Sequence, residues 1–101
     1  MNVMITGVAG FIGSNLADCL LALRQPRVRV FGLDNLSYGL RSQVPLGVVF
    51  HKADIRSKRL AELFRGMDCV FHLAAKNCLS DCQADPVETA DINVTGTVNV
   101  F

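Results

Sequence analysis

The sequence predicts an α/β fold with a doubly wound parallel sheet of about four strands in the order 3-2-1-4, covered by helices. Short apolar runs alternate with longer amphipathic runs along the chain, which is typical of parallel strands joined by crossover helices. The first apolar run leads into a glycine-rich segment that opens the first amphipathic run. Together these features indicate a parallel sheet between helices.

Four short apolar runs are the expected strands, at residues 3–6, 28–33, 48–51 and 69–73. The first crossover helix is expected at residues 12–23, where apolar residues recur at helical spacing, and Pro26 marks its stop. The second strand ends at Asp34, which begins a polar loop.

Two more helices are expected after the third and fourth strands. Residues 57–65 have one apolar face, and Gly66 is placed to end this helix in a left-handed conformation. The last helix follows Asp85, because Asp85 can cap it, Pro86 fits the first helical position and Glu88 can reach back to the cap.

The last expected helix is still running at Phe101, with no closing strand after it. We therefore expect residues 1–101 to be the N-terminal part of one longer domain, truncated before its catalytic and substrate-binding part. Half of the 101 residues are apolar, which is enough for a single core.

Composition and charge argue against several classes of partner. The net charge is +1 and the basic residues are scattered, so we expect neither nucleic acid nor a membrane as a partner. The N-terminus lacks the basic lead of a secretory signal, so we expect a cytoplasmic protein with four reduced cysteines. Cys78 and Cys82 have no second pair of metal ligands near them in the sequence, so no metal site is expected.

Gly7, Gly10 and Gly13 form a G-x-x-G-x-x-G loop between the first strand and the first helix. This spacing is one residue longer than the G-x-G-x-x-G fingerprint of dinucleotide-binding proteins. Its physical demands are the same, because glycines allow a tight turn and a close approach to the pyrophosphate, which the helix N-terminus attracts. The loop predicts a Rossmann-type nucleotide site, and the alternative is that its glycines only shape a turn.

Asp34 lies 21 residues after Gly13, at the expected end of the second strand. An acidic residue at this position meets the adenosine ribose, where a carboxylate accepts hydrogen bonds from the 2′ and 3′ hydroxyls and repels a 2′-phosphate. Asp34 therefore favours NAD over NADP as the cofactor. The alternative is that Asp34 only forms a turn with Asn35.

Five segments, in order, resemble landmarks of the extended short-chain dehydrogenase/reductases, and in particular the NAD-dependent nucleotide-sugar epimerases and dehydratases. They are residues 6–14 (TGVAGFIGS), 34–37 (DNLS), 54–56 (DIR), 70–75 (VFHLAA) and 93–100 (NVTGTVNV). The resemblance implies backbone contacts of Phe11 and Ile12 to the pyrophosphate of NAD, and contacts of Asp54 and Ile55 beside its adenine. The full set of implied cofactor-binding residues is Gly7, Gly10, Phe11, Ile12, Gly13, Asp34, Asn35, Ser37, Asp54, Ile55, Leu73, Ala74, Ala75 and Lys76.

Several of these residues have structural alternatives. Asp54 is an equally good helix cap, and Ala74 and Ala75 are small enough to serve only close packing. Lys76 stands at a position that varies within the family. The alternative interpretation is that its side chain is only solvated beside the cleft. His72 is interpreted as a core histidine with satisfied hydrogen bonds rather than as a general base.

The catalytic pair of this family, as the resemblance implies, is a Tyr-x-x-x-Lys motif on a later helix. The one tyrosine here, Tyr38, is followed four residues later by Ser42, so no catalytic residue is expected in this chain. For the full-length protein the resemblance implies a nucleotide-sugar substrate that NAD oxidises transiently, and a homodimer as an open option. The competing hypotheses are a non-catalytic dinucleotide-binding module and an NADP-dependent reductase of the same superfamily.

One position departs from the family pattern. Ile92 stands where the family often has a polar residue that can contact the cofactor.

Overall fold

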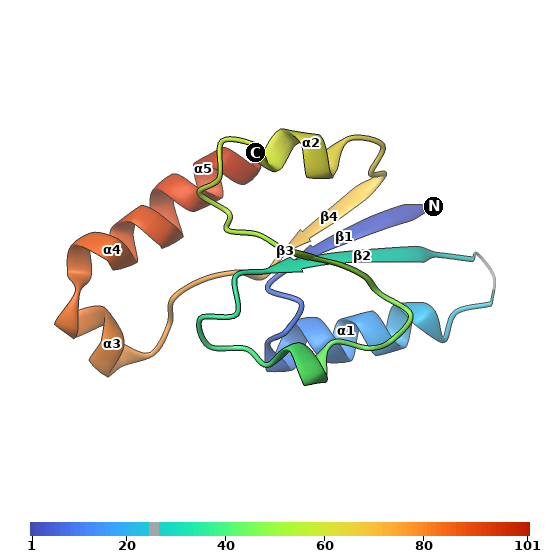
Figure 1. Ribbon diagram of the computed structural model, residues 1–101, viewed down its shortest axis with the longest axis horizontal. Coiled ribbons are helices and arrows are strands. Elements are labelled where there is room, and N and C mark those ends of the chain that lie inside the picture. The colour runs from blue at the N-terminus through green and yellow to red at the C-terminus, as the bar shows by residue number, and fades with distance from the viewer. Residues whose placement is uncertain (25–26) are drawn as a thin grey trace.

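The computed structural model describes residues 1–24 and 27–101 (Figure 1). Its sheet consists of β1 (Asn2–Thr6), β2 (Arg29–Asp34), β3 (Val49–Lys52) and β4 (Cys69–His72). Neighbouring strands are parallel, and their order is β3-β2-β1-β4. The predicted fold class and strand order are confirmed, and each strand boundary lies within about one residue of its predicted place.

The helical segments are α1 (Phe11–Leu21), the short 3-10 helix η1 (Arg41–Gln43), α2 (Leu60–Phe64), α3 (Leu79–Ala84), α4 (Pro86–Ala90), the π-helix η2 (Asp91–Gly96) and α5 (Thr97–Val100). Figure 1 shows α1 on one side of the sheet and α2 with α5 on the other. The sheet is therefore doubly wound, with helices on both faces. Pro26, which was expected to stop the first helix, lies outside the described residues.

The central strand β1 is buried, and its side chains alternate between two apolar clusters. Val3 and Ile5 belong to the cluster that includes Ala17 of α1. Met4 points to the opposite face and belongs to the cluster that includes Leu60 of α2. Because successive side chains of a strand point to opposite faces, burial on both sides explains the unbroken apolar run at the N-terminus.

The glycine loop after β1 has two positions where a side chain does not fit. Gly7 is left-handed (φ 73°), and a Cβ there would lie 2.9 Å from the backbone nitrogen of Ala74. A Cβ on Gly13 would overlap the carbonyl oxygen of Gly7. The loop therefore folds tightly onto the start of α1 and onto the segment after β4.

The helix expected at residues 57–65 is regular only in its middle. Before α2, the amide of Leu60 donates to the carbonyl of Ser57, three residues earlier, which is the spacing of a turn. After α2, Arg65 is extended (φ −62°, ψ 129°), and Gly66 has the predicted left-handed conformation (φ 80°). The predicted helix was therefore too long at both ends.

Helix α3 was not predicted. None of its residues is buried, and Leu79 at its start is 72% exposed. The segment consequently lacks the apolar stripe from which sequence periodicity predicts a helix.

The last predicted helix is confirmed from Pro86 onward, and α4, η2 and α5 follow one another without a break. The Asp85 side chain accepts a hydrogen bond from the Glu88 amide at 3.0 Å, as the capping motif predicts. The expected return contact of the Glu88 carboxylate to the cap is wrong, because this carboxylate pairs with the ammonium of Lys76 at 3.2 Å. An ion pair with a buried ammonium is a stronger interaction than a hydrogen bond to a backbone amide. The π-helical turn in the middle was not expected either.

Within residues 1–24 and 27–101, no helix combines the length and the apolar character that a membrane crossing requires.

A G13A variant tests the tight loop. The added methyl group overlaps backbone rather than a flexible side chain, so we expect a loss of about 2–4 kcal/mol in the free energy of unfolding, measured by urea titration. The matched control is G47A, whose Cβ would meet only the side-chain end of Leu21, at 3.1 Å, and which should cost less than about 1 kcal/mol. Equal stability of the two variants would contradict this account of the loop.

Candidate functional site

A pocket of about 530 Å³ lies at the carboxyl ends of the four strands. Segments that follow each strand form its walls, including Gly7 after β1, Asp34 after β2, Asp54 after β3 and Leu73 after β4. The chain reverses direction across the sheet between β1 and β4, and ligands of open α/β sheets bind at such a switch point. The volume is within the range of small-molecule and cofactor sites.

Every residue that the sequence analysis assigned to a cofactor lines this pocket, although lining by itself does not establish a role. These residues are Gly7, Gly10, Phe11, Ile12, Gly13, Asp34, Asn35, Ser37, Asp54, Ile55, Leu73, Ala74, Ala75 and Lys76. The pocket also contains lining residues that had not been assigned, namely Leu33, Tyr38, Gly39, Gln43, Ala53, Asn77, Glu88 and Ile92. Glu88 and Ile92 come from the last helix. The family resemblance marks the position of Ile92 as one that can contact the cofactor, whereas no motif in the sequence indicates Glu88.

The N-terminus of α1 opens into the pocket. Its N-cap is Gly10, which makes no side-chain cap, and the first turn has no acidic residue. The amides of Phe11, Ile12 and Gly13 occupy the first helical turn, where the helix itself supplies no acceptor. The positive end of the helix dipole and these amides favour a negatively charged group such as a phosphate.

The Asp34 carboxylate is held by two backbone amides. Oδ2 accepts from the Ala9 amide at 3.0 Å, and Oδ1 accepts from the Leu36 amide at 2.8 Å. The second bond closes a turn in which Leu36 adopts a left-handed conformation (φ 62°), which is uncommon for a leucine. Asp34 thus forms the turn proposed as an alternative and also lines the pocket, so the two interpretations are compatible.

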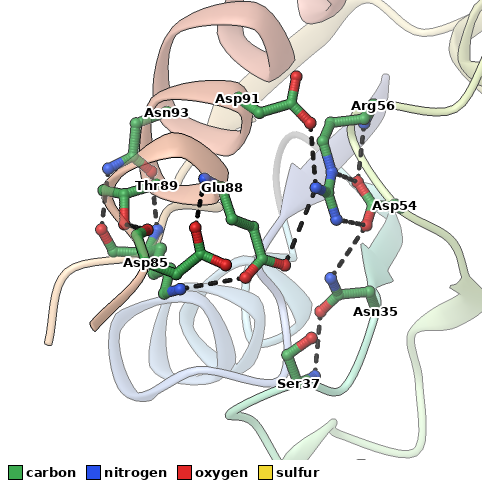
Figure 2. Close-up of polar contacts among 10 residues, drawn as sticks. Asn35, Ser37, Asp54, Arg56, Asp85, Glu88, Thr89, Asp91 and Asn93 are labelled. Atoms are coloured by element: carbon green, nitrogen blue, oxygen red, sulfur yellow. Dashed lines mark hydrogen bonds and ion pairs between the residues drawn. The ribbon is translucent and has the colours of Figure 1, made fainter. Parts of the chain in front are cut away.

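A second carboxylate, that of Asp54, is fixed from two sides (Figure 2). Arg56 pairs with it in a bidentate manner, with Nε 3.0 Å from Oδ1 and Nη2 2.8 Å from Oδ2. Asn35 donates to Oδ2 at 3.2 Å, and Arg56 Nη1 also lies 3.1 Å from a carboxylate oxygen of Asp91 on η2. The Arg56 hydrogen bonds hold the pKa of Asp54 well below its usual range, so this carboxylate is charged at neutral pH. Asn35 also orders the loop after β2, because its Oδ1 accepts a hydrogen bond from the Ser37 amide at 3.0 Å.

Lys76 is buried, with a relative exposure of 5%, so the alternative of a solvated lysine is wrong. Its Nζ lies 3.2 Å from Oε2 of Glu88. Burial disfavours the ammonium, but the hydrogen bond and the charge of Glu88 outweigh burial and raise the pKa of Lys76. The other oxygen of Glu88 lies 4.0 Å from Arg56 Nη1. Glu88 therefore lies between two cations, one from the segment after β3 and one from the segment after β4.

His72 has a hydrogen-bond partner on each ring nitrogen, as expected for a structural histidine. Nδ1 lies 2.7 Å from Oγ1 of Thr6, and Nε2 lies 3.0 Å from Oγ1 of Thr97. In the part of the chain that the structure describes, no group of three or more His, Cys, Asp or Glu residues is arranged to hold a metal ion. All four cysteines are free.

The glycine cradle, the helix N-terminus and the carboxylate at the end of β2 fit the adenosine diphosphate part of a dinucleotide. A Cβ on Gly13 would fill the space in which the loop turns onto α1. Asp34 lines the same pocket at the carboxyl end of β2. The polar groups that would hold the ligand are backbone amides and carboxylates. The cations near the pocket, Arg56 and Lys76, are already paired with carboxylates of the chain.

Comparison with known proteins agrees with this geometry. The sequence model of the NAD dependent epimerase/dehydratase family matches residues 3–101. The UDP-glucose 4-epimerase of Mycolicibacterium smegmatis is 38% identical over 107 residues, covering 99% of this chain and 33% of that protein. The UDP-glucose 4-epimerase of Streptomyces lividans is 36% identical over 99 residues, covering 94% of this chain and 29% of that protein.

Solved structures of this kind superpose closely on the chain. The UDP-glucose 4-epimerase of Thermus thermophilus in complex with NAD has a TM-score of 0.87 and 40% identity, covering 99% of this chain and 32% of that one. The dTDP-glucose 4,6-dehydratase of Streptomyces venezuelae with NAD bound has a TM-score of 0.88 and 34% identity, covering 99% of this chain and 34% of that one. The chain thus spans about a third of the length of these relatives, and it belongs to the NAD dependent epimerase/dehydratase family.

Proposed function

We propose that this chain is the NAD-binding part of a nucleotide-sugar epimerase or dehydratase. The observation that carries the proposal is the convergence on one pocket of the glycine loop, the α1 N-terminus and Asp34. Relatives of 34–40% identity were solved with NAD bound, which supports the same cofactor here.

The first half of the cofactor is assigned to the segments after β1, β2 and β3. Phe11 and Ile12 donate their amides to the pyrophosphate, because the first turn of α1 leaves these amides without helical acceptors. Asp34 accepts hydrogen bonds from the adenosine ribose. Asp54 and Ile55 lie beside the adenine, where the pairing with Arg56 keeps the Asp54 carboxylate charged and in place.

The second nucleotide is assigned to the segment after β4. Small side chains at Ala74 and Ala75 leave space at the switch point of the sheet. Lys76 closes this wall, and because its ammonium is paired with Glu88 it contributes little free positive charge toward a ligand. Such an arrangement suits the uncharged nicotinamide ribose better than an additional phosphate.

NAD, when bound, supplies the hydride chemistry at the sugar. The residues of this chain bind and orient it, and we propose that the full-length protein carries the catalytic Tyr-x-x-x-Lys pair and the sugar site beyond residue 101. UDP-glucose and UDP-galactose are the first substrates to test, because several of the similar proteins are UDP-glucose 4-epimerases. A dTDP-linked glucose is the second, because a dTDP-glucose 4,6-dehydratase superposes as closely.

A D34N variant tests the cofactor assignment. Loss of the charge weakens the ribose hydrogen bonds and removes the repulsion of a 2′-phosphate, so NAD affinity should fall by about tenfold or more while the preference for NAD over NADP narrows. Calorimetry of the full-length protein with both cofactors measures the two effects. D18N, an exposed substitution on α1 with the same change in charge, should bind both cofactors as the parent does. An unchanged ratio of NAD to NADP affinity in D34N would refute the assignment.

The reaction is tested by incubating the full-length protein with NAD and UDP-galactose and following the sugar by NMR. We expect conversion to UDP-glucose without net reduction of NAD, because the hydride returns to the sugar. Formation of a 4-keto product from dTDP-glucose instead would assign a dehydratase. Tight NAD binding with no turnover of either sugar would favour the non-catalytic binding module.

A further inference from the structure

The pocket wall that follows β4 is attached to β1 at Thr6, through both the side chain and the main chain of this residue. Oγ1 of Thr6 accepts hydrogen bonds from the amides of Leu73, at 3.0 Å, and Ala74, at 3.1 Å. Thr6 itself is fully buried. The Leu73 amide also donates to the main-chain carbonyl of Thr6, at 3.2 Å. The Thr6 hydroxyl is therefore a second acceptor for Leu73 and the acceptor that fixes the Ala74 amide.

The far end of the same wall is attached to the last helix. Oδ1 of Asn93 accepts from the Lys76 amide at 2.8 Å, and Nδ2 of Asn93 donates to the Lys76 carbonyl at 2.8 Å. One side chain thus pairs with both backbone groups of Lys76, as a neighbouring strand would.

His72 joins the two attachments. Its Nδ1 lies 2.7 Å from the Thr6 hydroxyl, and its Nε2 lies 3.0 Å from the hydroxyl of Thr97. The Thr97 hydroxyl in turn donates to the carbonyl of Asn93 at 2.6 Å. A continuous chain of hydrogen bonds therefore runs from β1 through β4 to the residue that holds Lys76.

The hydrogen bonds at Thr6 and at Thr97 require the same protonation state of the His72 imidazole. Oγ1 of Thr6 already accepts two amides, which occupy both lone pairs, so its proton is directed to Nδ1 of His72. The proton of Thr97 is used at the Asn93 carbonyl, so Thr97 accepts from Nε2. Nδ1 must be an acceptor and Nε2 a donor, which is the neutral Nε2–H tautomer.

The surroundings agree with a neutral ring. Burial lowers the pKa of His72 below its ordinary value. The Phe101 ring lies edge-on to the imidazole, with 6.3 Å between centroids and an interplanar angle of 89°. An imidazolium would place a second N–H against the Thr6 oxygen, whose lone pairs are already occupied.

We propose that His72 is a positioning residue: held as the neutral Nε2–H tautomer, it couples Thr6 to Thr97 and so fixes the wall of residues 73–76 in the shape that receives the second nucleotide of the cofactor. The identity of that ligand rests on the proposed function. The coupling between the two attachments does not, because it consists of contacts within the chain.

The tautomer is tested directly by long-range proton–nitrogen correlation NMR on the full-length protein labelled with nitrogen-15. At neutral pH we expect the His72 ring to show a protonated Nε2 and an unprotonated Nδ1. A protonated Nδ1, alone or together with Nε2, would overturn the proposal. This measurement requires neither cofactor nor substrate.

The coupling is tested with T97V, which removes the acceptor of Nε2, and T97S, which keeps it. We expect T97V to accelerate hydrogen exchange of the Ala74 and Lys76 amides and to weaken NAD binding, each by about three- to tenfold, and T97S to restore both. The matched control is T89V, because Thr89 makes a similar hydroxyl bond to the carbonyl four residues earlier, 2.8 Å from Asp85, in the same helix. If these amides exchange at the same rate in T97V and in T89V, the coupling is refuted. Faster exchange in a protein that binds no NAD would support the coupling and count against the proposed function instead.

Discussion

The attachment of the β1–α1 loop to its neighbours is the constraint on which the site depends. The amides of Gly7 and Val8 both donate to the Leu33 carbonyl of β2, at 2.9 and 3.2 Å, while the backbone of Gly7 also abuts the segment that follows β4. The loop is thus held by the ends of both strands that flank β1. Only glycine allows this approach, because any Cβ at the first loop position would meet the backbone of Ala74. The pocket at the sheet's carboxyl edge exists because three strand ends converge on this one turn.

Ion pairs hold the last helix beside the same pocket. Arg56 follows β3 and Lys76 follows β4. Glu88 and Asp91 pair with these cations, so ion pairs tie the last helix to both segments. Figure 2 shows Glu88 and Asp91 on either side of the Arg56 guanidinium. A buried cation such as Lys76 needs a partner, because an unpaired charge in a low-dielectric site costs far more than the pair contributes. The π-helical turn that contains Asp91 lies where the helix passes the pocket, and such turns often occur at functional sites.

The chemistry of the described residues is that of holding a cofactor. Amides at the α1 N-terminus, the carboxylates of Asp34 and Asp54 and a wall of small residues suit a dinucleotide, and the family to which the chain belongs uses NAD. His72 is the last residue of β4, and both its nitrogens are engaged in structural hydrogen bonds. Our proposed function accordingly assigns the acid–base groups of catalysis to the part of the relatives' length that this chain does not cover.

The sequence by itself predicted the strands and the glycine loop from local signals, such as apolar periodicity, glycine spacing and the residue at a strand end. The strand order followed from the α/β fold class, and most of the residues assigned to the cofactor followed from the resemblance to a known family. Every residue assigned to the cofactor lines the pocket, because each follows the carboxyl end of a strand and these ends meet at one edge of the sheet. The tertiary structure alone decided the partner of Lys76, the direction of the Glu88 side chain and the hydrogen-bond partners of His72. Those features arise from contacts between distant segments, such as Thr6 with His72, 66 residues apart, or Asp54 with Asn35, 19 residues apart, and no local pattern encodes them.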